Sequence, residues 1–258
     1  MRLRIETELN YAFAEPTQVI GLVHAASSSD QLIVTESFEI ASGASAAIDV
    51  GNHGQRRFRS CFCGSELVRY QADIDNGERE LLPSAGRQHL WSELPADVLH
   101  YLLPSRFCPS DRFQRFAQRE FGGAGDGVAR VMAILDWISR HVDYVHGVST
   151  AETTAAETFT VRAGVCRDFT HLGITLCRAL SIPSRAVGAY ALDLNPPDFH
   201  AVMEVFLDER WWLVDVTRLA PVEGLVRIAH GRDAADIAFL TTDRPSEMLG
   251  QNVSVSRL

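Results

Sequence analysis

Residues 164–190 read GVCRDFTHLGITLCRALSIPSRAVGAY, a sequence that carries the signals of a helix followed by a strand. Its apolar positions recur at helical spacing: Phe169, Leu172, Gly173, Leu176 and Leu180. Pro183 ends that pattern, because proline cannot continue a helix interior. The residues from 184 to 192 are typical of a strand. We therefore predict a helix that begins near Cys166, followed by a strand.

Cys166 stands at the expected start of this helix, and Gly164 permits a sharp entry into it. Unpaired backbone N–H groups and the positive end of the helix dipole stabilise a thiolate there. The same N–H groups could hold a developing oxyanion. Cys166 is therefore a candidate nucleophile. The alternative is a buried structural thiol, since free cysteine is among the most buried residue types.

A β-hairpin is predicted downstream, from His200 to Val216 with its turn around Asp208-Glu209. If the turn has two or four residues, paired positions have numbers that add to an odd total. His200 and Asp215 then share one face, opposite each other or one diagonal step apart. A three-residue turn would separate them unless a bulge intervened. A cysteine nucleophile needs such a base and orienter; the alternatives are a loop histidine and a solvent-exposed acid.

Three segments in this order resemble the transglutaminase-like superfamily of papain-like cysteine enzymes. They are residues 164–190, DFHAVMEVFL at 198–207 and WWLVDVTRLAP at 211–221. The resemblance covers about residues 126–221. It implies that Cys166 is the nucleophile, His200 the general base and acid, and Asp215 the orienting carboxylate.

Two positions depart from the family pattern. Val202 stands where many members have an aromatic residue, and Val216 stands in an Asp-x-Thr sequence where proline is commoner. Neither is one of the three residues matched to catalytic roles. They blur the assignment to a subfamily.

The fold class that follows is α+β, with three parts along the chain. Residues 1–85 alternate in polarity between turn-forming clusters and predict a β-sandwich, which is similar to the N-terminal β domain of bacterial members. Residues 86–125 are broken by Pro and Gly and predict a connector. Residues 126–258 are expected to form the transglutaminase-like core, beginning with a helix capped by Asp126 and ending in a polar C-terminal extension.

Composition narrows the classes of function. The chain has 258 residues, 24 basic and 33 acidic, for a formal charge of −9, which disfavours a nucleic-acid partner. No apolar run approaches the ~20 residues of a membrane helix, so we expect no membrane partner. The five cysteines have no framework spacing and no export signal precedes them, which favours reduced thiols in the cytoplasm.

The implied reaction is acyl transfer at a peptide or side-chain amide of a protein substrate, through a thioester on Cys166. Tyr144 is a candidate second oxyanion donor; its alternative is a packed core tyrosine. We expect no cofactor and no metal, because no calcium-loop pattern of acids appears. Two rivals stay open: a catalytically silent module that binds peptides or partners, and an acetyl transferase using the same triad. The sequence leaves the oligomeric state undecided.

The remaining cysteines and histidines are weaker candidates for a catalytic or metal-binding role. Cys61 and Cys63 would share a strand face, most simply as half-buried positions; a metal site there would need His53 and His89 as further ligands. Cys177 lies three helical turns beyond Cys166, ~16 Å away, and is expected in the core. 

His171 is an alternative base that helical geometry turns away from Cys166. Trp211 and Trp212 must face opposite ways, so one is expected in the core and the other could floor a groove. Residues 231–233 could border the site or hold a surface ion pair.

Overall fold

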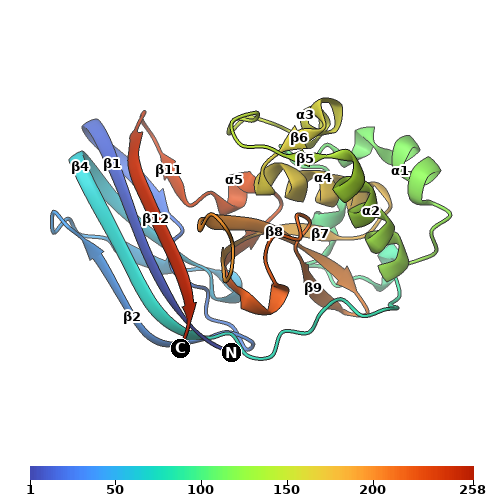
Figure 1. Cartoon of the computed structure of the whole chain (residues 1–258), viewed down its shortest axis with the longest axis horizontal. Coiled ribbons are helices and arrows are strands. Elements are labelled where there is room, and N and C mark those ends of the chain that lie inside the picture. The colour runs from blue at the N-terminus through green and yellow to red at the C-terminus, as the bar shows by residue number, and fades with distance from the viewer.

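The computed structural model describes residues 1–258, apart from the side chain of residue 52. Two large antiparallel sheets lie side by side, and most helices gather over the second one (Figure 1). The strands are β1 (Arg2–Gly21), β2 (Leu32–Ile40), β3 (Ala47–Val50), β4 (Arg56–Asp75), β5 (Asp143–Tyr144), β6 (Ala163–Gly164), β7 (Ser184–Ala191), β8 (Phe199–Leu207), β9 (Arg210–Val214), β10 (Leu225–Gly231), β11 (Leu240–Thr242) and β12 (Glu247–Arg257). The helices are α1 (Gln114–Phe121), α2 (Val128–His141), α3 (Ala155–Val161), α4 (Cys166–Ala179), α5 (Ala234–Ile237) and the short 3-10 segments η1 (Asn52–Gly54), η2 (Trp91–Glu93), η3 (Leu99–Leu102), η4 (Ser110–Arg112) and η5 (Val222–Gly224).

The core consists of α4 packed on a four-stranded sheet in the order β10-β7-β8-β9. The predicted helix from Cys166 and the predicted strand after it are both confirmed as α4 and β7. Gly173 allows the helix to approach the sheet closely. A Cβ at this position would lie 3.0 Å from the Met203 sulfur and 3.1 Å from the Val216 side chain. Helices α1, α2 and α3 surround α4 on its other sides (Figure 1).

The register between β8 and β9 decides which side chains share a face. Leu207 pairs with Arg210, so the turn has two residues and paired numbers add to an odd total. This confirms the register that puts His200 and Asp215 on one face. Asp208 and Glu209 have φ values of 48° and 63°, the positive pair that a type I′ turn requires.

The connector supports this turn, which contains neither Gly nor Asn. Asp208 donates its backbone N–H to the carbonyl of Arg87, and Glu209 donates its own to Nε2 of His89 at 2.8 Å. Residues 86–125, the predicted connector, contain the short helical pieces η2, η3, η4 and α1. One of its roles is therefore to hold the hairpin turn.

The four N-terminal strands, β1 to β4, belong to one six-stranded sheet built around the long strands β1 and β4; β11 and β12 are its other two strands. Along β1, buried Leu3, Ile5 and Leu9 alternate with exposed polar residues. This inner face packs against residues of β7 and β10, including Tyr190 and Ile228.

An α+β fold with an added β domain is thus confirmed, but the sandwich expected within residues 1–85 is corrected. The N-terminal strands form a single sheet, and the apolar face of a single sheet must be covered by another element. Residues of β7 and β10 in the core sheet provide that cover.

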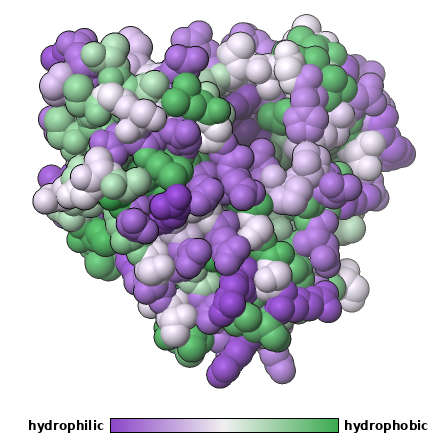
Figure 2. All heavy atoms as spheres, turned by 60° about the vertical axis from the view of Figure 1, so that its left-hand side comes forward, coloured by the Kyte–Doolittle hydropathy of each residue, from purple (hydrophilic) through white to green (hydrophobic). Residues whose placement is uncertain are grey.

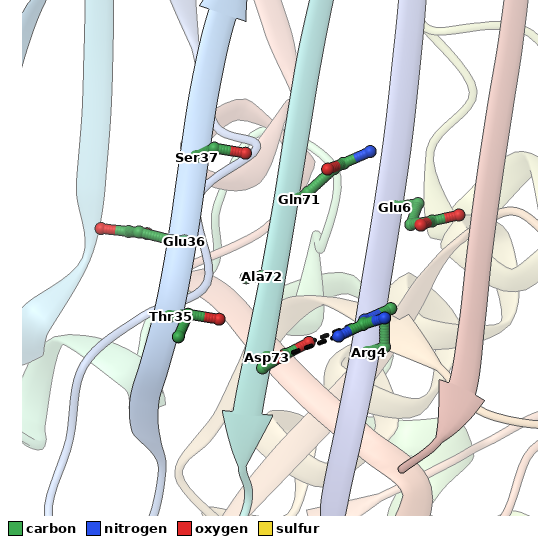
Figure 3. A pocket seen from close by; sticks show the side chains of 8 residues that line it. All are labelled: Arg4, Glu6, Thr35, Glu36, Ser37, Gln71, Ala72 and Asp73. Atoms are coloured by element: carbon green, nitrogen blue, oxygen red, sulfur yellow. Dashed lines mark hydrogen bonds and ion pairs between the residues drawn. The ribbon is translucent and has the colours of Figure 1, made fainter.

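The outer face of this sheet is polar, as in an antiparallel sheet that faces water on one side. A shallow depression of about 380 Å³ lies across β1, β4 and β2. Figure 3 shows the side chains that line it, with Arg4 pointing toward Asp73, to which it donates a hydrogen bond of 2.8 Å. Its lining residues are Arg4, Glu6, Thr35, Glu36, Ser37, Gln71, Ala72 and Asp73. Figure 2 turns this side of the molecule forward and shows mainly hydrophilic residues, with scattered hydrophobic ones and a hollow near the top.

The C-terminal residues leave the core, which corrects a second expectation. We expected residues 126–258 to lie together and to end in a polar tail, yet β11 and β12 both pair with β1. Leu3 faces Arg257 across the ladder, and Val253 is buried in the inner face. The two chain ends therefore lie side by side in one sheet (Figure 1).

Two smaller points concern the helices. The first core helix, α2, has Gly127 at its N-cap, in place of the expected Asp126, whose carboxylate instead accepts from the Gly127 N–H at 2.8 Å. None of the helices that the structure describes combines the length and the apolar character needed to cross a bilayer.

Candidate active site

Cys166 is the first residue of α4 and is partly exposed, whereas Cys108 and Cys177 are fully buried. The strand pair β5–β6 leads into the helix, and Val145 donates its backbone N–H to the carbonyl of Gly164 at 2.9 Å. Cys166 is thus presented on the first turn, where backbone N–H groups have no partner within the helix. This is the position that the sequence predicted for it.

Asp168 holds this helix start in place. It is fully buried, and its carboxylate accepts from the Val165 N–H at 2.9 Å. Arg167 donates to it at 3.0 Å, and the Ser149 hydroxyl donates to the same group. Asp168 thus satisfies an unpaired N–H group at the helix terminus. The contacts of Ser149 and Arg167 with Asp168 were not predicted, since a serine in a distant loop carries no local signal for them.

The structure joins His200 and Asp215 by a hydrogen bond of 3.0 Å between Nε2 and Oδ2. Both side chains are buried, at 1% and 2% exposure. Asp215 lies just beyond β9, where the chain turns back over its carboxylate. The backbone N–H groups of Leu219 and Ala220 donate to Oδ2 at 3.1 and 3.0 Å. Thr217 donates both its N–H and its hydroxyl to Oδ1, at 2.9 and 2.7 Å.

These contacts explain the protonation states of the pair. Burial by itself lowers the pKa of His200, but hydrogen bonds with Asp215 and Cys166 outweigh it and raise the pKa to about 9. Burial likewise raises the pKa of Asp215, but the His200 bond and the donors from Thr217 and Ala220 lower it below its ordinary value. The pair is therefore an imidazolium beside a carboxylate at neutral pH.

The other ring nitrogen of His200 serves Cys166. Nε2 is committed to Asp215, and Nδ1 is buried with no hydrogen-bond partner among the described residues. Cys166 lies close enough to raise the pKa of His200, and Nδ1 is the ring nitrogen left free to face its thiol. The structure thus brings Cys166, His200 and Asp215 together in the order that a thiol, a base and an orienting carboxylate require.

Tyr144 lies on the other side of Cys166. Its hydroxyl neighbours both the backbone N–H and the thiol of Cys166, while its ring contacts Phe169 at 5.7 Å between centroids. Burial first, and then the charge of the Cys166 thiolate, raises the pKa of Tyr144 above its ordinary value. The phenol therefore keeps its proton and is a donor. Tyr144 packs against the core, as the alternative expected, and its role as a second oxyanion donor stays a prediction.

A cleft of about 740 Å³ opens over Cys166 and His200. Its floor includes Gly188, Ala189 and Ala201 of β7 and β8. Its far wall comes from residues 234–241, which the sequence analysis did not connect with the site. The lining of this wall begins at Ala234, so residues 231–233 adjoin the cleft but do not line it. The surface ion pair that was the alternative is present between Arg232 and Asp236, while Asp233 is buried at the start of α5.

Other residues weighed for chemistry lie elsewhere. His171 is buried, with a pKa lowered by burial to about 4; its Nε2 accepts from the Ala234 N–H at 3.1 Å. Burial raises the pKa of the Cys177 thiol to about 12, in keeping with its expected core position. Trp212 is in the core, and Trp211 packs with Phe206 and under the Arg185 guanidinium; the residues that line the cleft include neither tryptophan.

The Cys61 and Cys63 side chains share one face of β4, as predicted, but they are exposed and not half-buried. Their face is the outer one, because Phe62 between them points into the core. The histidines considered as metal ligands have other neighbours. The His53 ring lies beside that of His230, tilted by 54° at 5.2 Å between centroids, and His89 accepts from the Glu209 N–H.

Comparison with known proteins agrees with this geometry. Residues 114–216 match the family model of the transglutaminase-like superfamily. The crystal structure of a putative cysteine protease from Cytophaga hutchinsonii has 38% sequence identity and a TM-score of 0.92, covering 100% of this chain and 91% of that one. The uncharacterized protein ML0607 of Mycobacterium leprae (strain TN) is 24% identical over 180 residues, and the match covers 63% of the length of each.

A helix that begins with a cysteine and packs on an antiparallel sheet, beside an added β domain, defines the class of protein. The chain belongs to the transglutaminase-like superfamily. Its similarity to the Cytophaga protein supports an enzyme of the general cysteine-dependent kind.

Asp215→Asn should lower the pKa of His200 from about 9 toward its ordinary value of 6.5, because the charge that favours the imidazolium is gone. A His pKa raised in the folded state adds stability that is complete below pH ~6.5 and is lost as the pH rises through ~9. The free energy of unfolding of the variant should therefore fall further below wild type at pH 6 than at pH 10. NMR titration of the His200 ring and urea unfolding at both pH values measure this.

Asp198→Asn, at the exposed edge of the cleft, is the control. A pKa of His200 that stays near 9 in Asp215→Asn contradicts the role given to Asp215.

Proposed function

We propose that the chain catalyses acyl transfer at a peptide or side-chain amide, as a protease or amidase or in the manner of a transglutaminase, through a thioester on Cys166. The observation that carries the proposal is the run of contacts from Cys166 through His200 to the buried Asp215 carboxylate, at the floor of a cleft. In this proposal Cys166 is the nucleophile, His200 the general base and acid, and Asp215 the orienting carboxylate.

The reaction has two halves. The Cys166 thiolate attacks the carbonyl carbon, and the C–S bond forms as the carbonyl oxygen takes up negative charge. The His200 imidazolium then gives its proton to the amide nitrogen, the C–N bond breaks and the amine leaves. Neutral His200 next takes a proton from water or from an acceptor amine, which attacks the thioester carbon. The C–S bond then breaks, the acid or the new amide is released, and the Cys166 thiolate is restored beside the His200 imidazolium.

Charge on the tetrahedral oxygen requires donors that are in place beforehand. The Cys166 backbone N–H, at the positive end of α4, is one candidate. The Tyr144 hydroxyl is the second, and its raised pKa supports a donating role, because the phenol stays protonated throughout the working range of the imidazolium.

The same contacts favour an enzyme over the two rivals. A silent partner-binding module has no need for an imidazolium held beside a thiol, a pairing that the raised pKa of His200 supports. An acetyl transferase would have to bind a large anionic donor, and the cleft carries Glu152 and Asp198 as well as Arg106 and Arg167. A peptide or protein amide is thus the proposed substrate, and the cytoplasm stays a prediction from the cysteines.

Trapping of the acyl-enzyme tests the proposal. The full chain is incubated with a mixed library of acyl peptides bearing activated esters, quenched in acid and mapped by mass spectrometry. We expect an acyl group on Cys166 that hydroxylamine removes, absent in Cys166→Ala and strongly reduced in His200→Ala. Cys61→Ala is the matched control, since Cys61 is exposed but lies outside the cleft. Equal labelling of Cys61 and Cys166 would overturn the proposal.

Tyr144→Phe should slow acyl-enzyme formation by about 10²–10³-fold, the usual cost of one oxyanion donor, with little change in KM. The ring contact with Phe169 is kept, so the fold should not suffer. Stopped-flow burst kinetics measure the rate, and Tyr11→Phe in the N-terminal sheet is the control. A rate within about twofold of wild type would assign Tyr144 to packing alone.

A further inference from the structure

Residues 234–241, here called the wall segment, form the far wall of the cleft described above. The segment runs from α5 into β11 and lies between the N-terminal sheet and α4 (Figure 1). It therefore connects the two halves of the molecule at the place where the cleft opens.

The wall segment is fixed at both ends. On the core side, Ala234 donates its N–H to His171 of α4 at 3.1 Å, and the buried Asp233 carboxylate accepts from the N–H groups of Ala235 and Phe107, at 3.0 and 2.9 Å. On the sheet side, Leu22 donates its N–H to the Phe239 carbonyl at 2.9 Å. 

The pairing of β11 with the end of β1, from Val19 to Gly21, continues this attachment. Such a segment is a fixed surface and not a mobile loop. This attachment also gives the buried, neutral His171 a structural role, because His171 accepts a hydrogen bond from the wall segment.

The surface that the wall helps to enclose is apolar. His200 is the one polar residue among the buried, described residues that line the cleft. The other buried lining residues are apolar, namely Leu22, Phe107, Ala189 and Ile228. Ile237, Ala238 and Phe239 of the wall add to them and are only partly covered.

Gly188 lies in the floor directly beside Ile237 of the wall. A Cβ on Gly188 would come within 3.8 Å of the Ile237 Cβ, an ordinary contact distance, so the wall packs closely against the floor at this point. The cleft volume of about 740 Å³ is in the range of sites that bury a small ligand.

Charge does not select the ligand, because the charged residues of the cleft are of both signs. Arg106, Glu152 and Asp198 are exposed at its edge, and Arg167 is already engaged by Asp168 and Ser149. Apolar area is therefore the main source of selection available.

We infer that the wall segment and the end of β1 form an apolar subsite that accepts a large apolar side chain next to the amide attacked by Cys166. The N-terminal sheet thus takes part in substrate selection, because it supplies Leu22 and anchors the wall. This inference rests on the proposed acyl transfer, because the subsite is defined by its place next to the attacked amide. Binding of a side chain in the subsite can nevertheless be tested without that reaction. The substrate class is a peptide with an aromatic or branched aliphatic residue at that position.

The test compares two alkylating reagents, N-acetyl-phenylalanyl and N-acetyl-glycyl chloromethyl ketone. In each, the thiolate forms a C–S bond and chloride leaves, so the ratio of their rates reports the side chain alone. The corrected ratio is the phenylalanyl-to-glycyl rate ratio at Cys166 divided by the same ratio at Cys61. In the full chain we expect this corrected ratio to be at least about ten. Equal corrected rates would overturn the subsite.

Variants locate the preference. Ile237→Asp puts a charge on the apolar wall and should reduce the corrected ratio to near one. Ala238→Phe fills the cleft without removing core packing and should do the same, in case Ile237→Asp unfolds. Ile48→Asp, at an exposed isoleucine of β3, is the control and should keep the wild-type ratio. A ratio that persists in both wall variants, with folding verified by circular dichroism, contradicts the inference.

Iodoacetamide separates this result from the proposed function. It has no side chain to place, so its rate at wild-type Cys166 relative to Cys61 reports only activation of the thiol. If Cys166 is no faster than Cys61 with iodoacetamide but the phenylalanyl preference holds, the acyl-transfer proposal fails and the subsite stands. If Cys166 is activated but the preference is absent, the reverse is true.

Discussion

The hydrogen bond between His200 and Asp215 is the interaction on which the site depends. Two titratable groups are buried there, and burial of an unpaired charge would be costly. They pair because a two-residue turn fixes the register of β8 and β9, and because the chain after β9 turns its N–H groups onto the carboxylate. The connector holds that turn through His89. Structure far from the thiol thus determines the protonation state of the ring beside it.

The second requirement is a helix start that presents Cys166 to this ring. Asp168 closes the first turn from within the fold, and Gly173 lets the helix rest close to Met203. The sheet that carries His200 and the helix that carries Cys166 are thereby packed as one unit. The N-terminal sheet covers the remaining end of the same core sheet, and the cleft lies where the two coverings meet. This arrangement gives the added β domain a direct connection to the site.

Much of the core was predictable because its signals are local. Helical spacing after Cys166, the stop at Pro183 and the parity of His200 with Asp215 all depend on neighbours within a few residues or across one turn. The errors came from long-range contacts. Pairing of Leu3 with Arg257, the cover that β10 gives to the N-terminal sheet and the approach of residue 237 to Gly188 leave no periodic trace in the chain. A polar-looking C-terminal tail is a strand only when β1 is there to pair with it.

The central claim is that His200 holds Cys166 in a reactive ionised pair. The most direct measurement is the pH dependence of iodoacetamide alkylation at each cysteine, mapped by peptide mass spectrometry in wild type and in His200→Ala. The account predicts that Cys166 alone reacts rapidly at pH 6, that its rate changes again near pH 9 as His200 loses its proton, and that His200→Ala slows the reaction at pH 6 by about tenfold or more. If Cys166 reacts at pH 6 no faster than the exposed Cys61, and His200→Ala changes nothing, the claim is contradicted.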